Sequence, residues 1–156
     1  MNIKWLLNSF FFQVRDLVHD NIVRLIGLCS DSPNVAIITE LCSRGSLQDL
    51  LQNESIHLDW TFRYSIINDI VNGMQFLHNS AIEYHGRLKS SNCVIDNRFV
   101  VKLSDYGLVN LMSLVVPEDE INYRILLWTS PEHLKSRNPL FGGSQKGDVY
   151  RYEKLD

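Results

Sequence analysis

The pattern of hydrophobic and polar positions divides the chain into strand-like runs, helical segments and one long irregular stretch. Two runs rich in β-branched residues, at 22–28 and 35–40, flank the turn sequence DSPN. This combination predicts an antiparallel hairpin. A second pair of strand-like runs, NCVID and FVVKL, surrounds the turn residues Asp96 and Asn97 and predicts another hairpin.

Two helices are predicted between these hairpins. Ser46, with Asp49 three residues later, resembles a capping box and predicts that a short helix starts there. Asp59 is a good N-cap for a longer helix. Apolar residues then recur at close to the helical period over about five turns, at Trp60, Tyr64, Ile67, Ile70, Val71, Met74 and Leu77.

The N-terminal stretch WLLNSFFFQV is predicted to be the end of a buried helix. A targeting segment is the alternative, but no small-residue cleavage site follows it, and it is too short to span a bilayer. From Gly107 to about Ser130 there is little periodicity, which predicts a long loop. A further helix is predicted to start near Pro131.

Composition indicates one globular unit with a hydrophobic core, because the chain has 156 residues, of which 45% are hydrophobic. The 15 basic and 18 acidic residues give a net charge of -3, so we expect no binding to nucleic acid or to an anionic membrane surface. We also expect no direct membrane insertion by this chain. The three cysteines, Cys29, Cys42 and Cys93, have no C-x-x-C spacing. They predict neither a disulfide framework nor a zinc site, and they favour a reducing cytosol.

The order of the short motifs resembles that of a protein kinase C-lobe. His85, Leu88 and Asn92 have the spacing of the kinase catalytic loop H-R-D-L-x-x-x-N. The triplet at 105–107 matches D-F-G, and the Pro-Glu pair at 131–132 matches A-P-E. The resemblance implies an α+β fold of the protein kinase type. It would be partial, with the end of an N-lobe (the end of helix αC and two strands) and the first half of a mainly helical C-lobe.

The residue at position 87 differs from the kinase catalytic-loop motif, and this difference decides whether the loop can accept a proton. Kinases have an aspartate there, which accepts the proton of the substrate hydroxyl, whereas this chain has Arg87. A guanidinium group stays charged and cannot accept a proton, so a contribution of about 10²–10⁴ to the rate is lost. Arg87 either pairs with a carboxylate of a loop or is solvated, and the sequence leaves both open.

The other half of a kinase nucleotide site is not recognisable before His19. The phosphate-binding Gly-rich loop and the V-A-I-K lysine should precede the αC segment, but the first glycine is Gly27. The αC glutamate that would pair with this lysine should lie near Phe10, where the sequence reads SFFFQ. We therefore expect no ion pair at that position.

Longer runs resemble a more specific family, the kinase-homology domain of membrane receptor guanylate cyclases. They are RGSLQDLLQNESIHLDWTFRYSIINDIVNGMQFLHNS, HGRLKSSNCVID, LWTSPE and GSQKGDVY. The resemblance covers about residues 14–150. It implies a domain without kinase activity that lies in the cytoplasm between a transmembrane helix and a cyclase domain. Such a domain binds ATP as an allosteric ligand and controls cyclic GMP synthesis by the dimer.

The resemblance implies roles for individual residues. Asn92 and Asp105 are candidate Mg²⁺ ligands, Lys89 would lie near the phosphates of ATP, and the backbone of Glu40, Leu41 and Cys42 would lie near adenine. An alternative for Asp105 is that it braces its own loop without any metal. Structural roles are implied for His85, for Glu132, and for Asp148, which would brace the catalytic loop.

The chain contains no recognisable cyclase, ectodomain or transmembrane segment, so the implied partners are ATP, a cyclase domain and the dimer partner of a parent receptor. Residues 1–13 and 151–156 are candidates for an unrelated head and tail of a partial domain. The long predicted helix would then leave an apolar stripe uncovered, which predicts a marginal and partly molten chain. Alternative functions are a residual protein kinase and a scaffold that binds no nucleotide.

Overall fold

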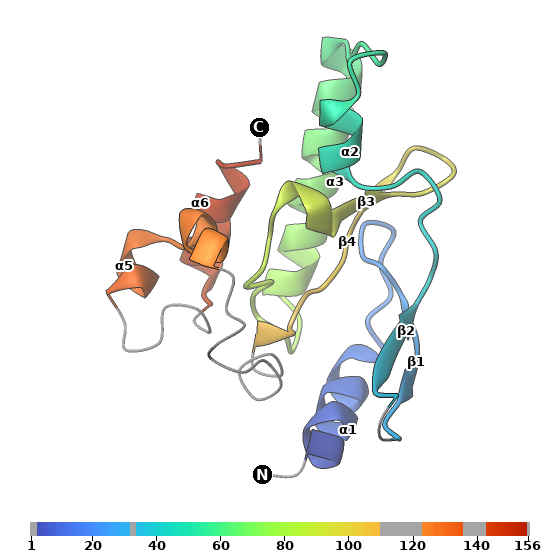
Figure 1. Cartoon of the computed structure of the whole chain (residues 1–156), viewed down its shortest axis with the longest axis vertical. Helices are drawn as coiled ribbons and strands as arrows, with labels where there is room; N and C mark the ends of the chain where they lie inside the picture. Colours follow the sequence, from blue (N-terminus) through green and yellow to red (C-terminus); the bar gives the residue numbers. More distant parts are fainter. Residues whose placement is uncertain (1–2, 32–33, 110–122, 136–142, 156) are drawn as a thin grey trace.

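The computed structural model describes residues 3–31, 34–109, 123–135 and 143–155. Helices alternate with two small antiparallel sheets along these residues (Figure 1). This mixture confirms the predicted α+β class. None of the helices in the described part of the chain is both long enough and apolar enough to cross a membrane.

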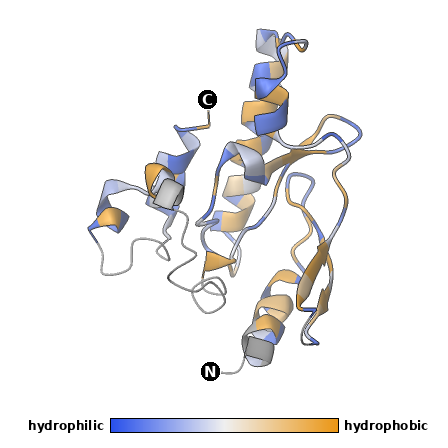
Figure 2. Ribbon diagram, viewed as in Figure 1, coloured by the Kyte–Doolittle hydropathy of each residue, from blue (hydrophilic) through white to orange (hydrophobic). Residues whose placement is uncertain are grey.

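The first helix, α1 (Ile3–Val14), confirms the helix predicted at the N-terminal end. Its buried side chains are Leu7, Phe10 and Val14, which recur at the spacing of one helical face. Figure 2 shows that hydrophobic residues concentrate in α1 and in the neighbouring β1–β2 hairpin. The buried face of α1 therefore belongs to the same core as the rest of the chain. That residues 1–13 are unrelated sequence stays a prediction, and the same holds for residues 151–156.

The first predicted hairpin is confirmed as β1 (Leu25–Cys29) paired antiparallel with β2 (Ala36–Thr39). However, only the later part of the strand-like run 22–28 belongs to this hairpin. Ile22 forms a parallel bridge with Leu103, and the Val23 N–H donates to the Leu103 carbonyl at 2.9 Å. The beginning of this run therefore joins the second sheet, because buried backbone groups take the partner that lies beside them.

The short helix α2 (Leu47–Gln52) begins with the predicted capping box. The Ser46 hydroxyl accepts from the Asp49 N–H at 3.2 Å, and the Asp49 carboxylate accepts from the Ser46 N–H at 2.8 Å. Gly45 precedes the cap with a φ of +78°, a conformation that favours glycine.

The long helix α3 (Trp60–His78) begins, as predicted, at the N-cap Asp59, whose carboxylate accepts from the Phe62 N–H. Only part of the predicted apolar stripe is buried, namely Ile70, Met74 and Leu77. The other members are exposed: Trp60, Tyr64, Ile67 and Val71. The exposed stripe agrees with an uncovered apolar face, whereas the partly molten state of the chain stays a prediction.

The second predicted hairpin is confirmed as β3 (Cys93–Ile95) paired antiparallel with β4 (Val101–Leu103). Its turn is longer than the two residues expected. The Asp96 carboxylate accepts from the N–H groups of Arg98 and Val100 at 2.8 and 3.0 Å, so one side chain stabilises the whole turn.

The C-terminal part contains short helices only. A 3₁₀ helix, η3 (Tyr123–Trp128), lies in the segment expected to be a loop, which corrects that expectation for these residues. Short 3₁₀ turns carry little periodic signal. The rest of the expected loop, 110–122, lies outside the described residues. Helix α5 (Pro131–Leu134) starts at the predicted proline, and α6 (Gln145–Tyr152) is capped by the Ser144 hydroxyl.

Gly73 of α3 marks the closest approach between this helix and the second sheet. A Cβ atom at this position would lie 2.7 Å from the Asn21 carbonyl oxygen and 3.0 Å from Leu103 Cδ1. The backbone of Asn21 cannot withdraw easily, because its carbonyl accepts from the Leu103 N–H. The glycine is therefore needed for packing.

We predict that Gly73→Ala destabilises the protein by about 1–3 kcal/mol through overpacking, although alanine is favoured in helices by about 1 kcal/mol. Chemical unfolding monitored by circular dichroism measures the difference. Asn68→Ala, at an exposed position of the same helix, is the matched control and should be neutral or slightly stabilising. Equal or higher stability of Gly73→Ala would contradict the close packing.

Candidate functional site

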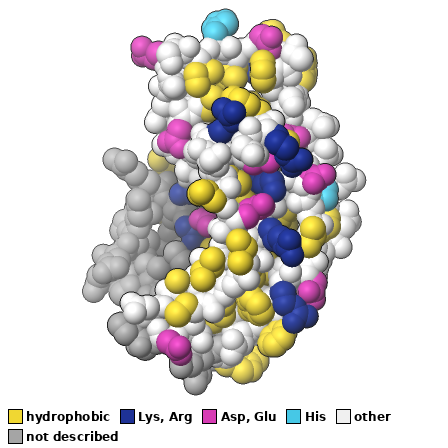
Figure 3. Space-filling model, turned by 90° about the vertical axis from the view of Figure 1, so that its right-hand side faces the viewer, with side chains coloured by type: hydrophobic (Ala, Val, Ile, Leu, Met, Phe, Trp, Pro, Cys, Tyr) yellow, Lys and Arg dark blue, Asp and Glu magenta, His cyan; other side chains and the backbone are white. Residues whose placement is uncertain are grey.

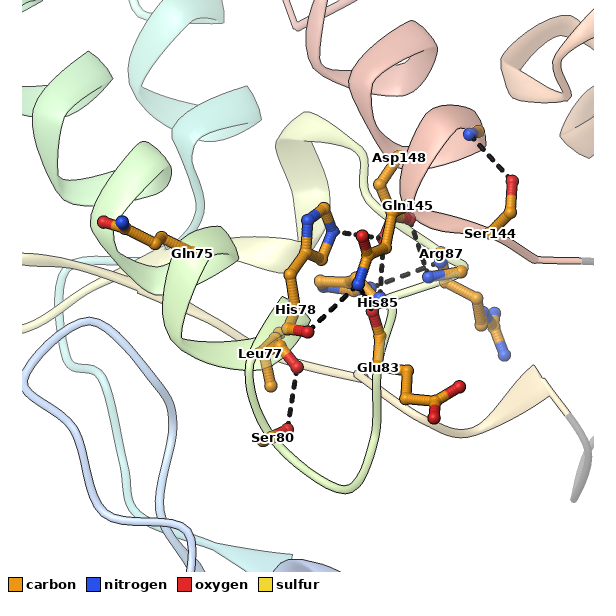
Figure 4. A network of polar contacts seen from close by, with 12 residues as sticks. Gln75, Leu77, His78, Ser80, Glu83, His85, Arg87, Ser144, Gln145 and Asp148 are labelled. Atoms are coloured by element: carbon orange, nitrogen blue, oxygen red, sulfur yellow. Dashed lines mark hydrogen bonds and ion pairs between the residues drawn. The ribbon is translucent and has the colours of Figure 1, made fainter.

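Asp148 joins three separate segments through its carboxylate (Figure 4). It lies in the first turn of α6 and is only 1% exposed. Its Oδ2 accepts from the His85 N–H at 2.7 Å, and its Oδ1 accepts from the Gly86 N–H at 2.8 Å. His78, the last residue of α3, places Nε2 3.1 Å from Asp148 Oδ2. One buried carboxylate thus holds α3, α6 and the loop with the motif HGRLKSSN together.

His85 is a buried part of this loop and not a reactive group. Its ring is fully buried, and its Nδ1 accepts from the Arg87 N–H at 3.2 Å, which assigns the proton to Nε2. Nε2 has no hydrogen-bond partner among the described residues. Burial lowers the pKa of His85 to about 4, against the attraction of Asp148, so the ring is neutral at pH 7.

Asn92 and Asp105 lie close together, because residue 104 binds the backbone of Asn92. The Asn92 carbonyl accepts from the Ser104 N–H at 2.9 Å and from its hydroxyl at 3.1 Å. Asn92 Nδ2 donates to the Arg87 carbonyl at 2.8 Å, which leaves Oδ1 of the amide available as a ligand. Asp105 follows directly with an exposed side chain and a φ of +60°, in the left-handed region.

Arg87 has the position where a kinase would have its base. Its side chain is half-buried and extends away from Asp148 (Figure 4). Within the described residues Arg87 forms no ion pair, and its buried Nε has no hydrogen-bond partner. The sequence left open whether Arg87 pairs with a carboxylate of a loop or is solvated. Among the described residues, Arg87 does not pair with a carboxylate.

One of the residues predicted to lie near adenine, Glu40, belongs to a partly buried ion pair that the sequence did not predict. Lys102 Nζ of β4 lies 2.8 Å from Glu40 Oε1, which also accepts from the Arg24 N–H. Although burial alone would raise the pKa of the Glu40 carboxyl, these hydrogen bonds hold it below its usual value. The only signal in the sequence was a lysine within the apolar run FVVKL. Leu41 is exposed and Cys42 half-buried beside Glu40.

Phe10 is buried where the αC glutamate was expected. It lines an apolar cavity of about 140 Å³ together with Thr39, Asp105 and Tyr106. The Tyr106 hydroxyl donates to the Val23 carbonyl at 2.8 Å, another contact that the sequence did not indicate. The position that holds a carboxylate in kinases is thus apolar in this chain.

The predicted metal ligands fit Mg²⁺ only together with a ligand that brings further oxygens. The described residues contain no group of three or more His, Cys, Asp or Glu residues that could hold a metal ion. Asn92 Oδ1 and the Asp105 carboxylate would supply two protein oxygens, and Mg²⁺ in such sites takes the remainder from phosphates and water. Lys89 is half-buried two residues after Arg87.

Glu132 is exposed in the first turn of α5. Its own backbone N–H is the main cause of its lowered pKa. Within the described part of the chain it forms no ion pair, so its structural role stays a prediction. Figure 3 shows Lys and Arg side chains interleaved with Asp and Glu side chains on one face of the molecule.

The lowered pKa of His85 predicts a pH dependence of stability. The unfolded chain binds a proton near the usual pKa of 6.5, whereas the folded chain does so only at about 4. Unfolding therefore takes up a proton in this window, so stability is complete above pH 6.5 and falls as the pH is lowered toward 4. The total loss from this residue is roughly 3 kcal/mol.

This dependence is measured by chemical unfolding between pH 7 and pH 4. His85→Gln should flatten the curve relative to the unchanged protein, whereas His57→Gln, at an exposed histidine, should not. Parallel curves for the unchanged protein and His85→Gln would show that His85 is protonated equally in both states.

Comparisons with known proteins agree with this geometry. The profile described as "Protein tyrosine and serine/threonine kinase" matches residues 11–154. Atrial natriuretic peptide receptor 2 of Homo sapiens is 57% identical over 141 residues, which cover 89% of this chain and 13% of that protein. Receptor-type guanylate cyclase gcy-28 of Caenorhabditis elegans is 48% identical over 149 residues, which cover 90% of this chain and 11% of that protein.

Retinal guanylyl cyclase 2 of Homo sapiens is 44% identical over 152 residues, which cover 97% of this chain and 14% of that protein. The chain thus spans 11% to 14% of the length of these relatives. The chain belongs to the protein tyrosine and serine/threonine kinase family, as part of the kinase-like domain found in receptor guanylate cyclases.

Proposed function

We propose that this chain is a regulatory module without kinase activity, which couples ATP binding to cyclic GMP synthesis by the cyclase domain of a receptor guanylate cyclase. In such a receptor it would lie on the cytoplasmic side of the membrane, next to the cyclase domain and a dimer partner. The observation that carries the proposal is the cation at position 87, beside a loop that is otherwise held in the kinase arrangement.

A general base needs a lone pair within hydrogen-bonding distance of the proton that it removes. The Arg87 guanidinium has none at physiological pH. Asp148, the carboxylate held against this loop, already accepts from His85, Gly86 and His78 and is 1% exposed. It is therefore not available to an incoming hydroxyl, which supports the proposed lack of phosphate transfer.

Binding of ATP is supported by groups that remain available around the site. Asn92 Oδ1 and the exposed Asp105 carboxylate would hold Mg²⁺, which would neutralise the phosphates. Lys89 would add a positive charge near them. Among the described residues no backbone hydrogen bond uses the N–H or carbonyl of Cys42, so both could bind adenine.

A scaffold that binds no nucleotide is the second candidate, and one observation favours it. The exposed apolar side chains of α3, Trp60, Tyr64, Ile67 and Val71, lie on a surface that a partner protein could cover. A scaffold and an ATP-dependent regulator differ in whether the chain binds nucleotide at all.

Equilibrium binding of labelled ATP, with and without Mg²⁺, tests the proposed function. We expect saturable binding that needs Mg²⁺, without formation of ADP above background. Asp105→Ala should weaken the binding roughly tenfold, about 1.4 kcal/mol, because one of the two protein ligands is lost. Asp20→Ala, at an exposed aspartate, is the matched control and should bind as the unchanged protein does.

Two outcomes would contradict the proposal in different ways. Absence of saturable binding in the folded protein would favour the scaffold. Consumption of ATP that disappears in Asp105→Ala would show instead a residual protein kinase that works without a conventional base.

A further inference from the structure

The segment that connects β2 to α2, residues 40–45, is attached to the second sheet at its far end (Figure 1). The Arg44 N–H donates to the Ile95 carbonyl at 3.1 Å, and the Gly45 carbonyl accepts from the Ile95 N–H at 2.8 Å. Ile95 is the last residue of β3. These two backbone hydrogen bonds fix where the segment ends, just before the capping box of α2.

Glu40 fixes the beginning of the same segment through its backbone and its side chain. The Glu40 N–H donates to the Arg24 carbonyl at 3.0 Å, and the Arg24 N–H donates to Glu40 Oε1 at 2.9 Å. Glu40 Oε1 also lies 2.8 Å from Lys102 Nζ. Lys102 is the central residue of β4 and pairs with Val94 of β3. The ion pair therefore attaches the beginning of the segment to the second sheet as well.

The ion pair is better explained by the position that it imposes than by the stability that it adds. The side chains of Lys102 and Glu40 are 11% and 31% exposed, so both charged groups have lost much of their hydration. This loss offsets most of the attraction between such charges, and an apolar pair of similar volume is often as stable. A hydrogen-bonded pair accepts only a narrow range of distances and angles. It therefore specifies where the segment lies.

We propose that Lys102 is a positioning residue, which together with Glu40 holds the backbone of Leu41 and Cys42 in place for a planar ligand of the adenine type. Within the described residues no backbone hydrogen bond uses the N–H or the carbonyl of Leu41 or Cys42. Free backbone groups that are already held in place can bind a ligand with little further loss of conformational freedom. The ligand class rests on the proposed function, whereas the holding of the segment does not.

The holding of the segment is tested without any ligand, by native-state hydrogen exchange at the amides of Arg24 and Glu40. In Lys102→Met, which removes the cation and keeps most of the side-chain length, we expect both amides to exchange roughly tenfold faster. The Gly86 amide, which Asp148 binds, should keep its rate and shows that the fold is intact. Lys146→Met, at an exposed lysine of α6, removes the same charge elsewhere and should change none of these rates. Unchanged rates in Lys102→Met would overturn the proposal.

Glu40→Gln provides a second variant, because its amide oxygen can still accept from the Arg24 N–H while the charge is removed. We expect a smaller acceleration in the same direction, since a neutral amide binds a cation more weakly than a carboxylate does. The variant with both changes should exchange no faster than Lys102→Met alone, because the two side chains act as a pair. If Lys102→Met does not fold, Glu40→Gln decides the test. Additive effects of the two changes would overturn the pair.

Competition with labelled ATP tests what the segment positions. We expect Lys102→Met to weaken competition by adenosine roughly tenfold, because the backbone groups of the segment are no longer held in place. Competition by Mg²⁺ tripolyphosphate, which lacks the base, should stay as in the unchanged protein. The opposite result, with weaker competition by tripolyphosphate and unchanged competition by adenosine, would show that Lys102 attracts phosphates directly and would overturn the positioning role.

Failure of the proposed function would look different from both results. The unchanged protein would then bind no labelled ATP, while Lys102→Met would still accelerate exchange at the amides of Arg24 and Glu40 and so support the holding of the segment. Faster exchange together with unchanged competition by adenosine would instead overturn the role of the segment in binding the base, although ATP binds.

Discussion

The architecture of the site depends on one buried carboxylate and the three groups that face it. Asp148 reaches the loop through the N–H groups of His85 and Gly86 and reaches the end of α3 through His78. Hydrogen bonds to a charged acceptor in a buried place are strong, and loss of such an acceptor leaves several donors unsatisfied together. The positions of Arg87 and Asn92 follow, because both belong to the loop that this carboxylate holds.

Around this framework, the chain keeps the asparagine and the aspartate of the kinase motifs and differs in charge at two other positions. Asn92 and Asp105 remain close through Ser104, whereas Arg87 adds a cation and Phe10 removes an anion. Arg87 has no lone pair with which to accept a substrate proton, and the proposed regulatory role without kinase activity rests on this change.

Local signals in the sequence predicted the elements well, since each depends on a few neighbouring residues. Ser46 with Asp49, Asp59 and Pro131 all begin helices in the structure. Contacts between distant segments were not predictable in this way. The Lys102–Glu40 ion pair and the Tyr106 hydroxyl bond to Val23 join residues 62 and 83 positions apart, and no local pattern encodes them. The bracing role expected of Asp148 came from family resemblance, not from spacing.

The most direct test of this account is native-state hydrogen exchange at the backbone amides of His85 and Gly86. We expect both amides to exchange slowly, although they lie in a loop, because the Asp148 carboxylate binds them. In Asp148→Asn both should exchange much faster, whereas in Glu153→Gln, an exposed position just after α6, they should not change. Exchange as fast as that of exposed loop amides in the unchanged protein, or no acceleration in Asp148→Asn, would contradict the claim that this carboxylate holds the loop.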